Sequence, residues 1–532
     1  MDESSQLSTD ERYLSSVVTH NGSHVPLLGD GHVFKLDYNK NELNVPKPSP
    51  PFLVLRPVES DREPSFSILK SQQHPAANSS VYCGTLEALE KLTSGDAKVV
   101  YLASIKLNNP EVLEHKAGDS ISILCANHPA DVNWLLSRTC LDPVLNPDCP
   151  FSVESSTSKP VSPWLIPGQP VTARFLLTYC CELHCPVSRR TIRLLADCCS
   201  DSPDGMEQSK RLMLLCSREG NQLYDNIIRG AGLTLLDLLC CFPECRQIPL
   251  VRLLELLPRL QPRPYTLINE DSGMLQFIFT RVDFHYPVTE EHTGVRRYRN
   301  RLHGTCTGWL ETLWNCGGEP RNVLLYLRQN LNGFYLPEEP RHPLILIGAG
   351  SGLAPFLAFL SRCAKLKKEN APFPAVIWLI YGCRSPETSL ILADKLDEAI
   401  FDGILKHCCL CFSRYPTLSD QTVSELPDCV PSNLRKKACL HLDVRYVQDC
   451  IFSTQRESAL TLHDILLAEL VVNSNATIMV CGESRAMAPA VYASWENLLS
   501  AYFERENDDR SEGREFLKQM RASGRYKEDI WT

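Results

Sequence analysis

Several hallmarks of membrane, secreted and nucleic-acid-binding proteins are missing from this sequence of 532 residues. No stretch reaches the roughly 18 uninterrupted apolar residues of a membrane span. The N-terminus, MDESSQLSTDERYLSS, is polar and acidic and lacks the positive and apolar regions of a secretory signal. A formal net charge of −9 leaves no basic excess for a general nucleic-acid role. We therefore expect a cytoplasmic protein that binds neither membranes nor nucleic acids.

The paired short spacing of a zinc ribbon or finger is also missing, although the chain has 24 cysteines. Three clusters stand out, namely Cys180, Cys181 and Cys185; Cys240, Cys241 and Cys245; and Cys408, Cys409 and Cys411. Because a reducing compartment is expected, we interpret the cysteines mostly as small core residues and predict no metal site. A zinc site in one of the clusters is the alternative interpretation.

What the chain does contain is an ordinary globular composition, with 43% hydrophobic and 22% charged residues. Residues 1–80 are rich in Ser, Asn and Pro and are predicted to form a disordered, linker-like N-terminus. Strand-like segments follow, namely KVVYLASIKL (98–107), SISILC (120–125) and VTARFLL (171–177), with a short helix over 130–137. We assign residues 81–177 and 260–340 to one β-rich domain.

The apolar pattern changes twice along the rest of the chain. From about residue 178 to residue 259, as in LTLLDLLCCF, apolar residues recur at helical spacing and predict a helical insertion. Strand character returns in LQFIFTRV (275–282). Over 341–532, short apolar strands alternate with helices, which is typical of a buried parallel sheet. The predicted fold class is α+β multidomain, with an antiparallel β-barrel that holds the insertion, followed by an α/β domain.

A glycine cluster marks the start of the predicted α/β domain. Gly348-Ala349-Gly350-Ser351-Gly352 lies between the strand LILI and a helix over 354–366. Glycines let backbone N–H groups approach a phosphate, and the helix N-terminus adds a positive dipole end. A tight structural turn also explains the cluster, but its position at a strand-to-helix junction favours a phosphate site. It departs from the standard dinucleotide fingerprint, because the third glycine comes early and Pro355 follows.

Two later segments would complete a nucleotide pocket. Ser413-Arg414 follows the predicted strand CCLCFSR, and Arg445-Tyr446-Val447-Gln448 comes about one helix–loop unit later. Arginine and serine bind a 2′-phosphate through charge-assisted hydrogen bonds, and tyrosine can stack on adenine. By residue type alone, solvated loop arginines are the simpler interpretation.

Two tetrapeptides suit a planar cofactor that carries a pyrophosphate. In Arg263-Pro264-Tyr265-Thr266 the arginine can hold the pyrophosphate, the tyrosine can lie against a flavin ring, and the threonine can bond near its reactive edge. Gly304-Thr305-Cys306-Thr307 opens the predicted helix GWLETLW, whose first N–H groups suit the same pyrophosphate. A strand entrance and a capped helix would explain either tetrapeptide alone.

The C-terminus ends in Asp529-Ile530-Trp531-Thr532. A free tail would expose the large apolar area of the tryptophan, so we expect the tail to be docked. The sequence leaves open whether Trp531 packs on core residues or on a ring-shaped cofactor.

In their order and spacing these motifs resemble the ferredoxin-reductase-like FAD/NADPH module of the diflavin reductases, over about residues 81–532. The segments LQPRPYT (260–266), GTCTGWL (304–310), RYVQD (445–449) and YKEDIWT (526–532) carry the resemblance. It implies hydride transfer from NADPH to FAD. It places FAD at Arg263, Tyr265, Thr266 and Gly304 to Thr307, and NADPH at Gly348 to Gly352, Ser413, Arg414, Arg445, Tyr446 and Gln448. It also implies catalytic roles for Thr266, Cys481, Asp529 and Trp531, with Trp531 covering the flavin.

The chain departs from the family pattern in ways that bear on function. Thr266 replaces the usual serine, and Leu267-Ile268-Asn269 follows where the family has a further serine. Only about 80 residues precede the module, whereas a flavodoxin-like domain needs roughly 140–150, so we expect no FMN. The resemblance then implies a separate flavodoxin-like protein or a cobalamin-dependent enzyme such as methionine synthase as the electron acceptor.

A non-catalytic module that binds or regulates such a partner is the alternative function. The loop GVRRYRNRLHG (294–304) contains Arg296, Arg297, Arg299 and Arg301 and is a candidate docking surface for an acidic partner. Solvated charge explains the same run of arginines.

Overall fold

The computed structural model describes residues 43–59, 66–108, 112–144, 146–230, 232–284, 303–317, 321–337, 342–414, 426–440, 444–452, 460–507 and 509–531. The chain forms two compact units. The first comprises Met1–Pro75, Leu124–Arg263 and Val282–Thr312, and the second comprises Ala76–Ile123, Pro264–Arg281 and Leu313–Thr532. None of the helices in the described ranges combines the length and the apolar character that a bilayer crossing requires.

A six-stranded parallel sheet forms the C-terminal part of the second unit, in the order β14-β13-β12-β11-β15-β16. Its central strands are runs of buried apolar residues, because helices cover both faces. The predicted α/β domain is therefore confirmed. The strands are β11 (Leu344–Ala349), β12 (Ile377–Cys383), β13 (His407–Phe412), β14 (Ala438–Leu440), β15 (Thr477–Glu483) and β16 (Tyr526–Trp531).

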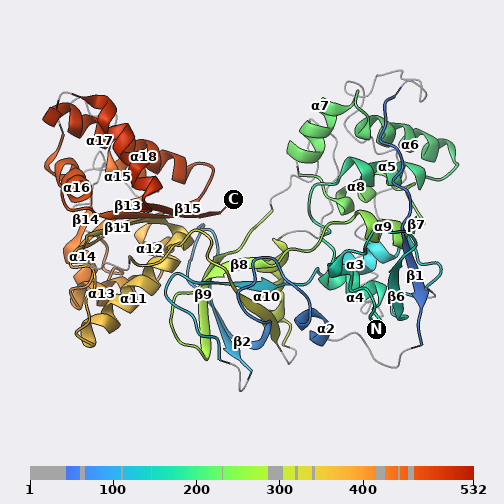
Figure 1. Cartoon of the computed structure of the whole chain (residues 1–532), viewed down its shortest axis with the longest axis horizontal. Helices are drawn as coiled ribbons and strands as arrows, with labels where there is room; N and C mark the ends of the chain where they lie inside the picture. Colours follow the sequence, from blue (N-terminus) through green and yellow to red (C-terminus); the bar gives the residue numbers. More distant parts are fainter. Residues whose placement is uncertain are drawn as a thin grey trace, which may run out of the picture. The chain divides into compact units, whose positions relative to one another are not determined.

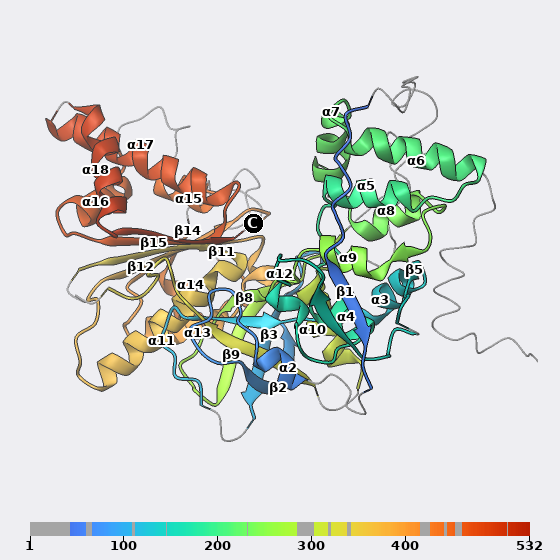
Figure 2. The same cartoon turned by 45° about the vertical axis from the view of Figure 1, so that its right-hand side comes forward.

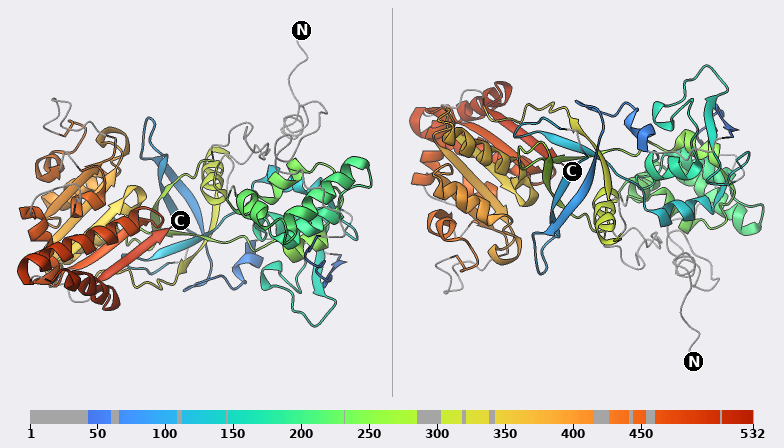
Figure 3. Two further views of the ribbon diagram at one scale, coloured as in Figure 1. Left: turned by 90° about the horizontal axis from the view of Figure 1, so that it is seen from above. Right: turned by 90° about the horizontal axis from the view of Figure 1, so that it is seen from below.

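Helices cover both faces of this sheet (Figure 1), and each face buries a separate hydrophobic core. Along β11, Leu344 and Leu346 point into one core, whereas Ile345 and Ile347 point into the other, as the two-residue period of a strand requires. Figure 3 gives the same layers from above and from below. One face carries α11 (Ala354–Lys368), α12 (Pro386–Ser389), α13 (Ala393–Phe401) and α14 (Ser432–Lys437), and the other carries α15 (Val447–Ile451), α16 (Leu462–Val472), α17 (Met487–Asn507) and α18 (Arg510–Ala522).

A second six-stranded sheet has the order β8-β4-β10-β2-β3-β9. The pairs β10–β2, β2–β3 and β3–β9 are antiparallel, as predicted. The Ile268 N–H donates to the Gln276 carbonyl at 2.9 Å, so the segment after edge strand β8 joins edge strand β9 and the sheet curls toward a barrel. The strands are β2 (Tyr82–Lys91), β3 (Val100–Leu107), β4 (Ser120–Leu124), β8 (Arg263–Thr266), β9 (Met274–Thr280) and β10 (Asn322–Arg328).

The first unit is mainly helical, and α5 and α6 lie side by side in it (Figure 2). The predicted helical character of residues 178–259 is confirmed, and α10 (Thr305–Asn315) forms where GWLETLW predicted a helix. The other elements are α2 (Phe66–Lys70), α3 (Pro129–Leu136), α4 (Ala173–Tyr179), α5 (Arg189–Asp197), α6 (Pro203–Cys216), α7 (Asn221–Leu223), a π-helix (Tyr224–Gly230), α8 (Leu235–Cys241), α9 (Leu250–Leu256), and the short strands β1 (Leu53–Pro57), β5 (Thr139–Cys140), β6 (Phe151–Ser155) and β7 (Ile248–Pro249).

Two predictions about local structure are wrong. The strand predicted over 171–177 is instead helix α4, because the Thr172 hydroxyl accepts the Phe175 N–H at 3.1 Å and caps a helix. A short apolar run does not distinguish a strand from a buried helix. The linker predicted over 1–80 contains strand β1, which pairs with β6 and buries Leu53 and Leu55. The boundaries between the two units also differ from the predicted domain boundaries, because residues 124–177 belong to the first, mainly helical unit.

Candidate functional site

The glycine cluster forms a tight turn at the carboxyl end of β11. Gly350–Leu353 is a short 3₁₀ helix that leads into α11, and Gly350 has a left-handed φ of +56°. A Cβ on Gly352 would lie 2.3 Å from the Cys481 carbonyl oxygen, so only glycine fits there. The Tyr381 hydroxyl donates to the Gly350 carbonyl at 3.1 Å. The turn sits where the sheet order reverses between β11 and β15, which is where α/β sheets bind ligands.

The C-terminal tail docks beside this turn as strand β16. In its parallel pairing with β15, Asp529 lies opposite Cys481. A Cβ on Gly352 would be 3.3 Å from the Cη2 atom of Trp531, so the indole lies next to the glycine turn. Trp531 is nevertheless 42% exposed. The indole is therefore positioned at the turn without being enclosed in the core.

The end of β8 meets the tail within the second unit. The Thr266 hydroxyl lies 3.3 Å from the Ser120 hydroxyl and 3.5 Å from the Asp529 carboxylate. The neighbouring Tyr265 ring packs 4.9 Å from Phe277, centroid to centroid. Thr266, Asp529 and Cys481, three of the predicted catalytic residues from segments far apart in the sequence, are thus brought together where the end of β8 meets β16.

Burial shapes the acid–base properties of this group. Desolvation raises the pKa of Asp529, while the hydrogen bond from Thr266 and the charge of Arg328 act in the opposite direction. Burial, together with the charge of Asp529, raises the pKa of the Cys481 thiol well above its ordinary value. Cys481 is therefore a neutral thiol at physiological pH, and Asp529 is the residue of the pair that can change charge.

In the first unit the structure brings the two predicted pyrophosphate segments together. The Arg263 guanidinium donates to Glu182 at 2.9 Å. Burial lowers the pKa of Arg263, but Cys125, Glu182 and Cys306 outweigh it and leave the pKa raised. Because Cys306 belongs to the 304–307 loop, this interaction shows that the arginine and the loop are neighbours. A cation beside backbone N–H groups suits an anionic group.

The 304–307 loop itself is held by local hydrogen bonds. The Gly304 N–H donates to the Val282 carbonyl at 2.8 Å, and the Val282 N–H donates to the Thr307 hydroxyl at 3.3 Å. Thr305 is the first residue of α10, so the N–H groups of its first turn lack helical partners. The donor set therefore fits a phosphate.

At the carboxyl ends of β12 and β13 an arginine corner forms. Ser413 and Arg414 follow β13, and the Arg414 guanidinium pairs with Asp96 at 3.1 Å. Arg384, just after β12, donates to the Asp96 carbonyl at 2.9 Å. Both members of the Arg414–Asp96 pair are largely exposed. The corner offers two cations, one of which is already paired with a carboxylate.

The other predicted 2′-phosphate segment leads into α15. Arg445 and Tyr446 are exposed, and Gln448 is half-buried. A Cβ on Gly382, in β12, would lie 2.9 Å from Val447 Cγ1, so the start of α15 sits close against the sheet. Exposed basic and aromatic side chains beside the strand ends suit a nucleotide phosphate and base.

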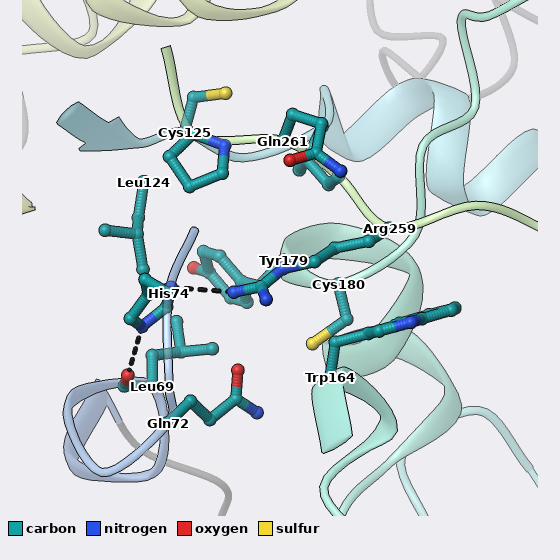
Figure 4. A pocket seen from close by; sticks show the side chains of 12 residues that line it. Leu69, Gln72, His74, Leu124, Cys125, Trp164, Tyr179, Cys180, Arg259 and Gln261 are labelled. Carbon is teal, nitrogen blue, oxygen red and sulfur yellow. Dashed lines mark hydrogen bonds between the residues drawn. The ribbon is translucent and has the colours of Figure 1, made fainter. Parts of the chain in front are cut away.

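A separate pocket lies in the first unit, next to the segment that precedes Arg263 (Figure 4). His74 Nε2 lies 2.8 Å from the Leu69 carbonyl, and Arg259 lies 2.8 Å from His74 Nδ1. Burial and Arg259 lower the pKa of His74 despite the Leu69 contact, so the neutral ring donates from Nε2 and accepts at Nδ1. These groups bond to one another, which fits a structural role. The pocket is lined by Leu69, Gln72, His74, Leu124, Cys125, Trp164, Tyr179, Cys180, Arg259, Leu260, Gln261 and Pro262.

Several neighbours of the site had no distinctive sequence signal. Ser120 and Arg328 act on Thr266 and Asp529 across the barrel strands, which no local motif reveals. Arg384 could have been found, because it directly follows a predicted parallel strand. Asp96 sits in the loop between β2 and β3, which resembles any polar turn. The arginines of the 294–304 loop lie outside the described residues.

Comparison with known proteins gives the family. Residues 74–309 match the FAD binding domain, and residues 346–401 match the oxidoreductase NAD-binding domain. Methionine synthase reductase of Homo sapiens is 29% identical over 512 residues, which cover 92% of this chain and 66% of the human protein. The Bos taurus protein is 30% identical over 515 residues, with 92% and 66% covered. NADPH–cytochrome P450 reductase of Mus musculus is 23% identical over 474 residues, with 87% and 60% covered.

The chain thus spans about two-thirds of the length of the methionine synthase reductases it matches. Arg263 and the 304–307 loop fall inside the FAD-domain match, and the glycine turn falls inside the NAD-domain match. The two domains follow each other in the order of the predicted module. The chain belongs to the FAD- and NADPH-binding diflavin reductases, and within them it is similar to methionine synthase reductase.

Proposed function

We propose that the chain is a cytoplasmic NADPH-dependent oxidoreductase that acts as the FAD/NADPH module of a methionine synthase reductase-like protein. The observation that carries the proposal is the meeting of Thr266, Asp529 and Cys481 beside the glycine turn. A hydroxyl, a carboxylate and a neutral thiol at the carboxyl edge of a parallel sheet suit the orientation of a nicotinamide against a flavin.

The residues divide into binding and positioning groups. Arg263 and the first turn of α10 would hold the FAD pyrophosphate, and Tyr265 would lie against its ring. The N–H groups around Gly350 to Gly352 would hold the pyrophosphate of NADPH. Ser413, Arg414, Arg445, Tyr446 and Gln448 would hold its 2′-phosphate and adenine. When bound, the two cofactors supply the hydride donor and acceptor.

The protein contributes orientation and charge. Ionised Asp529 would stabilise positive charge that develops on the nicotinamide, and the Thr266 hydroxyl, 3.5 Å away, would hold the carboxylate in place. The Cys481 carbonyl leaves no room for a side chain at Gly352. Trp531, which lies against that turn, would have to move for the nicotinamide to reach the flavin.

Trp531→Ala tests this gating role. We expect the variant to use NADH better relative to NADPH, or to release NADP⁺ more slowly, because the competing indole is gone. Steady-state and stopped-flow kinetics with both coenzymes measure the change. Unaltered kinetics with both coenzymes would remove Trp531 from the mechanism.

The absorption spectrum of the purified protein tests the proposal as a whole. Bound FAD that bleaches under anaerobic conditions when NADPH is added supports the oxidoreductase. A folded, colourless protein that does not take up added FAD contradicts it. Electrons would leave toward methionine synthase, another cobalamin protein or a separate flavodoxin-like protein, and reduction of each by the NADPH-reduced chain identifies the acceptor.

A second candidate function is a non-catalytic module that binds or regulates methionine synthase or another cobalamin protein. The ion pair between Arg263 and Glu182 favours it, because the arginine that would hold a pyrophosphate already has a carboxylate partner. Glu182→Gln separates the two functions. The substitution should tighten FAD binding if the pair competes with the pyrophosphate, and it should have no such effect if the protein never binds FAD.

A further inference from the structure

Three potential metal ligands meet on the face of the parallel sheet that carries α15 and α16. The side chains of Cys409, Cys450 and His463 come from β13, α15 and α16, and their ligand atoms all lie within 4.8 Å of one another. Both cysteines are buried and the histidine is half-buried. Local spacing could not predict this group, since the residues are far apart in the sequence.

We propose that Cys409, Cys450 and His463 bind a zinc ion. Two thiolates and an imidazole are a ligand set that zinc accepts, with the fourth position left to water. Cys450 Sγ lies 4.0 Å from His463 Nε2. Around tetrahedral zinc the ligand atoms would be about 3.5–3.8 Å apart, as follows from bond lengths of about 2.0–2.3 Å. The ligand atoms lie within 4.8 Å of one another, so they would have to approach by at most about 1.3 Å to reach that geometry.

The surroundings hold the ligands in place. The His463 ring lies 5.8 Å from the Trp378 ring, centroid to centroid, and its Nε2 is 3.0 Å from the Cys450 carbonyl. Zinc binding would replace that contact with a Zn–N bond, and each cysteine would release its thiol proton to solvent as a Zn–S bond forms. No electron transfer is involved.

The position of the group couples it to the proposed nucleotide site. β13 ends next to Ser413 and Arg414, and α15 starts next to Tyr446. An ion bound by Cys409 and Cys450 would join the strand and the helix that bear the two halves of the proposed 2′-phosphate site. This coupling rests on the proposed function, whereas metal binding does not.

Metal binding is measured on the full chain in a background that carries Cys316→Ser and Cys429→Ser, because these two cysteines are exposed and could bind zinc adventitiously. We expect one zinc per chain by elemental analysis. With Co²⁺ as the probe, we expect the visible bands of a tetrahedral thiolate complex at wavelengths beyond the flavin absorption. His463→Gln and Cys450→Ser should each weaken zinc binding at least about tenfold.

The control separates loss of ligands from loss of fold. Cys363→Ser changes another buried cysteine of the same unit and should leave zinc binding intact. Zinc should also raise the melting temperature of the background protein and not that of folded His463→Gln. Equal zinc affinity in His463→Gln, Cys450→Ser and the background, or no zinc bound by the folded background, would overturn the site.

Coupling to the nucleotide is measured with 2′,5′-ADP, which contains the 2′-phosphate and needs neither flavin nor turnover. Zinc should change its dissociation constant about threefold or more in the background protein and leave it unchanged in His463→Gln. If zinc binds but the dissociation constant of 2′,5′-ADP does not change, the proposed coupling is wrong and the proposed metal site still stands. Failure of the nucleotide itself to bind contradicts the proposed function.

Discussion

The two ends of the proposed NADPH site are built in different ways. At the glycine turn, backbone packs on backbone, since Gly352 has no room for a Cβ beside the Cys481 carbonyl. At the other end, Arg414 in the arginine corner and Arg445 and Tyr446 before α15 are exposed. The reaction end is therefore fixed by packing, and the phosphate end by surface charge. Substitutions at the reaction end should therefore have large effects that do not depend on salt. Substitutions at the phosphate end should have smaller effects that high salt screens.

Gly352→Ala should have the largest effect. Its new Cβ would lie 2.3 Å from the Cys481 carbonyl oxygen, and backbone cannot yield as a side chain can. We expect a loss of stability of about 1–3 kcal/mol, as for overpacked cores. Flavin reduction by NADPH should slow by about 100-fold, which is what a displacement of about an ångström can cost.

Thermal unfolding and stopped-flow reduction measure the two effects of this change. The matched control is Gly273→Ala, where the new Cβ would make only an ordinary 3.6 Å contact with Asp271. If Gly352→Ala reduced flavin as fast as the control, the turn would not be the rigid end of the site.

Asp529→Asn should have the second largest effect. Burial raises the pKa of this carboxyl, so it ionises at a higher pH than an ordinary aspartate. If the ionised form assists, the rate of flavin reduction should rise with pH through that raised pKa. Asn should lower the rate at least about tenfold and flatten this rise.

The stability of the wild-type protein should respond to pH in the opposite sense. An aspartate with a raised folded-state pKa favours its protonated form, so its contribution to stability falls as pH increases through that pKa. The stability of the Asp529→Asn variant should not show this fall with increasing pH. Glu528→Gln, at the adjacent position of β16, serves as the control for both profiles. A pH profile of reduction that survives in Asp529→Asn would assign the titration to another group.

The same contrast explains what the sequence could predict. The glycine turn, the parallel strands and helix α11 are local patterns, and the structure has them where they were predicted. The FAD-binding and NADP-binding character also followed from ordered motifs, and the family matches confirm it. Such features are determined by residues close together in the sequence, so a single sequence is enough to predict them.

Features that depend on distant contacts could not be predicted. Strand β1 forms by pairing with β6, about one hundred residues later in the sequence, and Glu255, about two hundred residues later, accepts the N–H groups of Phe52 and Leu53 at its start. Asp96 reaches Arg414 only because the barrel hairpin lies against the parallel sheet within the second unit. The roles of the individual site residues stay predictions until the variants are measured.

Arg414→Gln should have a smaller effect than either change at the reaction end. The side chain is more than half exposed, so its hydrogen bond to a phosphate should be worth about 1–1.5 kcal/mol. The KM for NADPH should increase about five- to tenfold, and the KM for NADH should stay the same. Arg435→Gln is the control, because this half-buried arginine of the same unit pairs with a different carboxylate, that of Asp428. Equal increases with both coenzymes would place Arg414 away from the 2′-phosphate.

Asp96→Asn should have the smallest effect and the opposite sign. The Asp96 carboxylate pairs with the Arg414 guanidinium at 3.1 Å, so it would compete with a 2′-phosphate for the same guanidinium. Exposed pairs of this kind contribute about 0.2–1 kcal/mol, so the KM for NADPH should fall by no more than about fivefold. The KM for NADH should be unchanged.

Two further measurements identify the cause of that change. High salt should abolish the difference between Asp96→Asn and wild type, because exposed charges are screened. In the Arg414→Gln background, Asp96→Asn should leave the KM for NADPH unchanged, because the guanidinium for which the carboxylate competes is no longer present. An undiminished effect in that background would mean that Asp96 acts through Arg384, to which only its carbonyl is bonded, or through the general field of the surface. More than one arginine would then contribute to NADPH binding at the phosphate end. That end would differ even more clearly from the glycine turn, where a single close backbone contact sets the geometry.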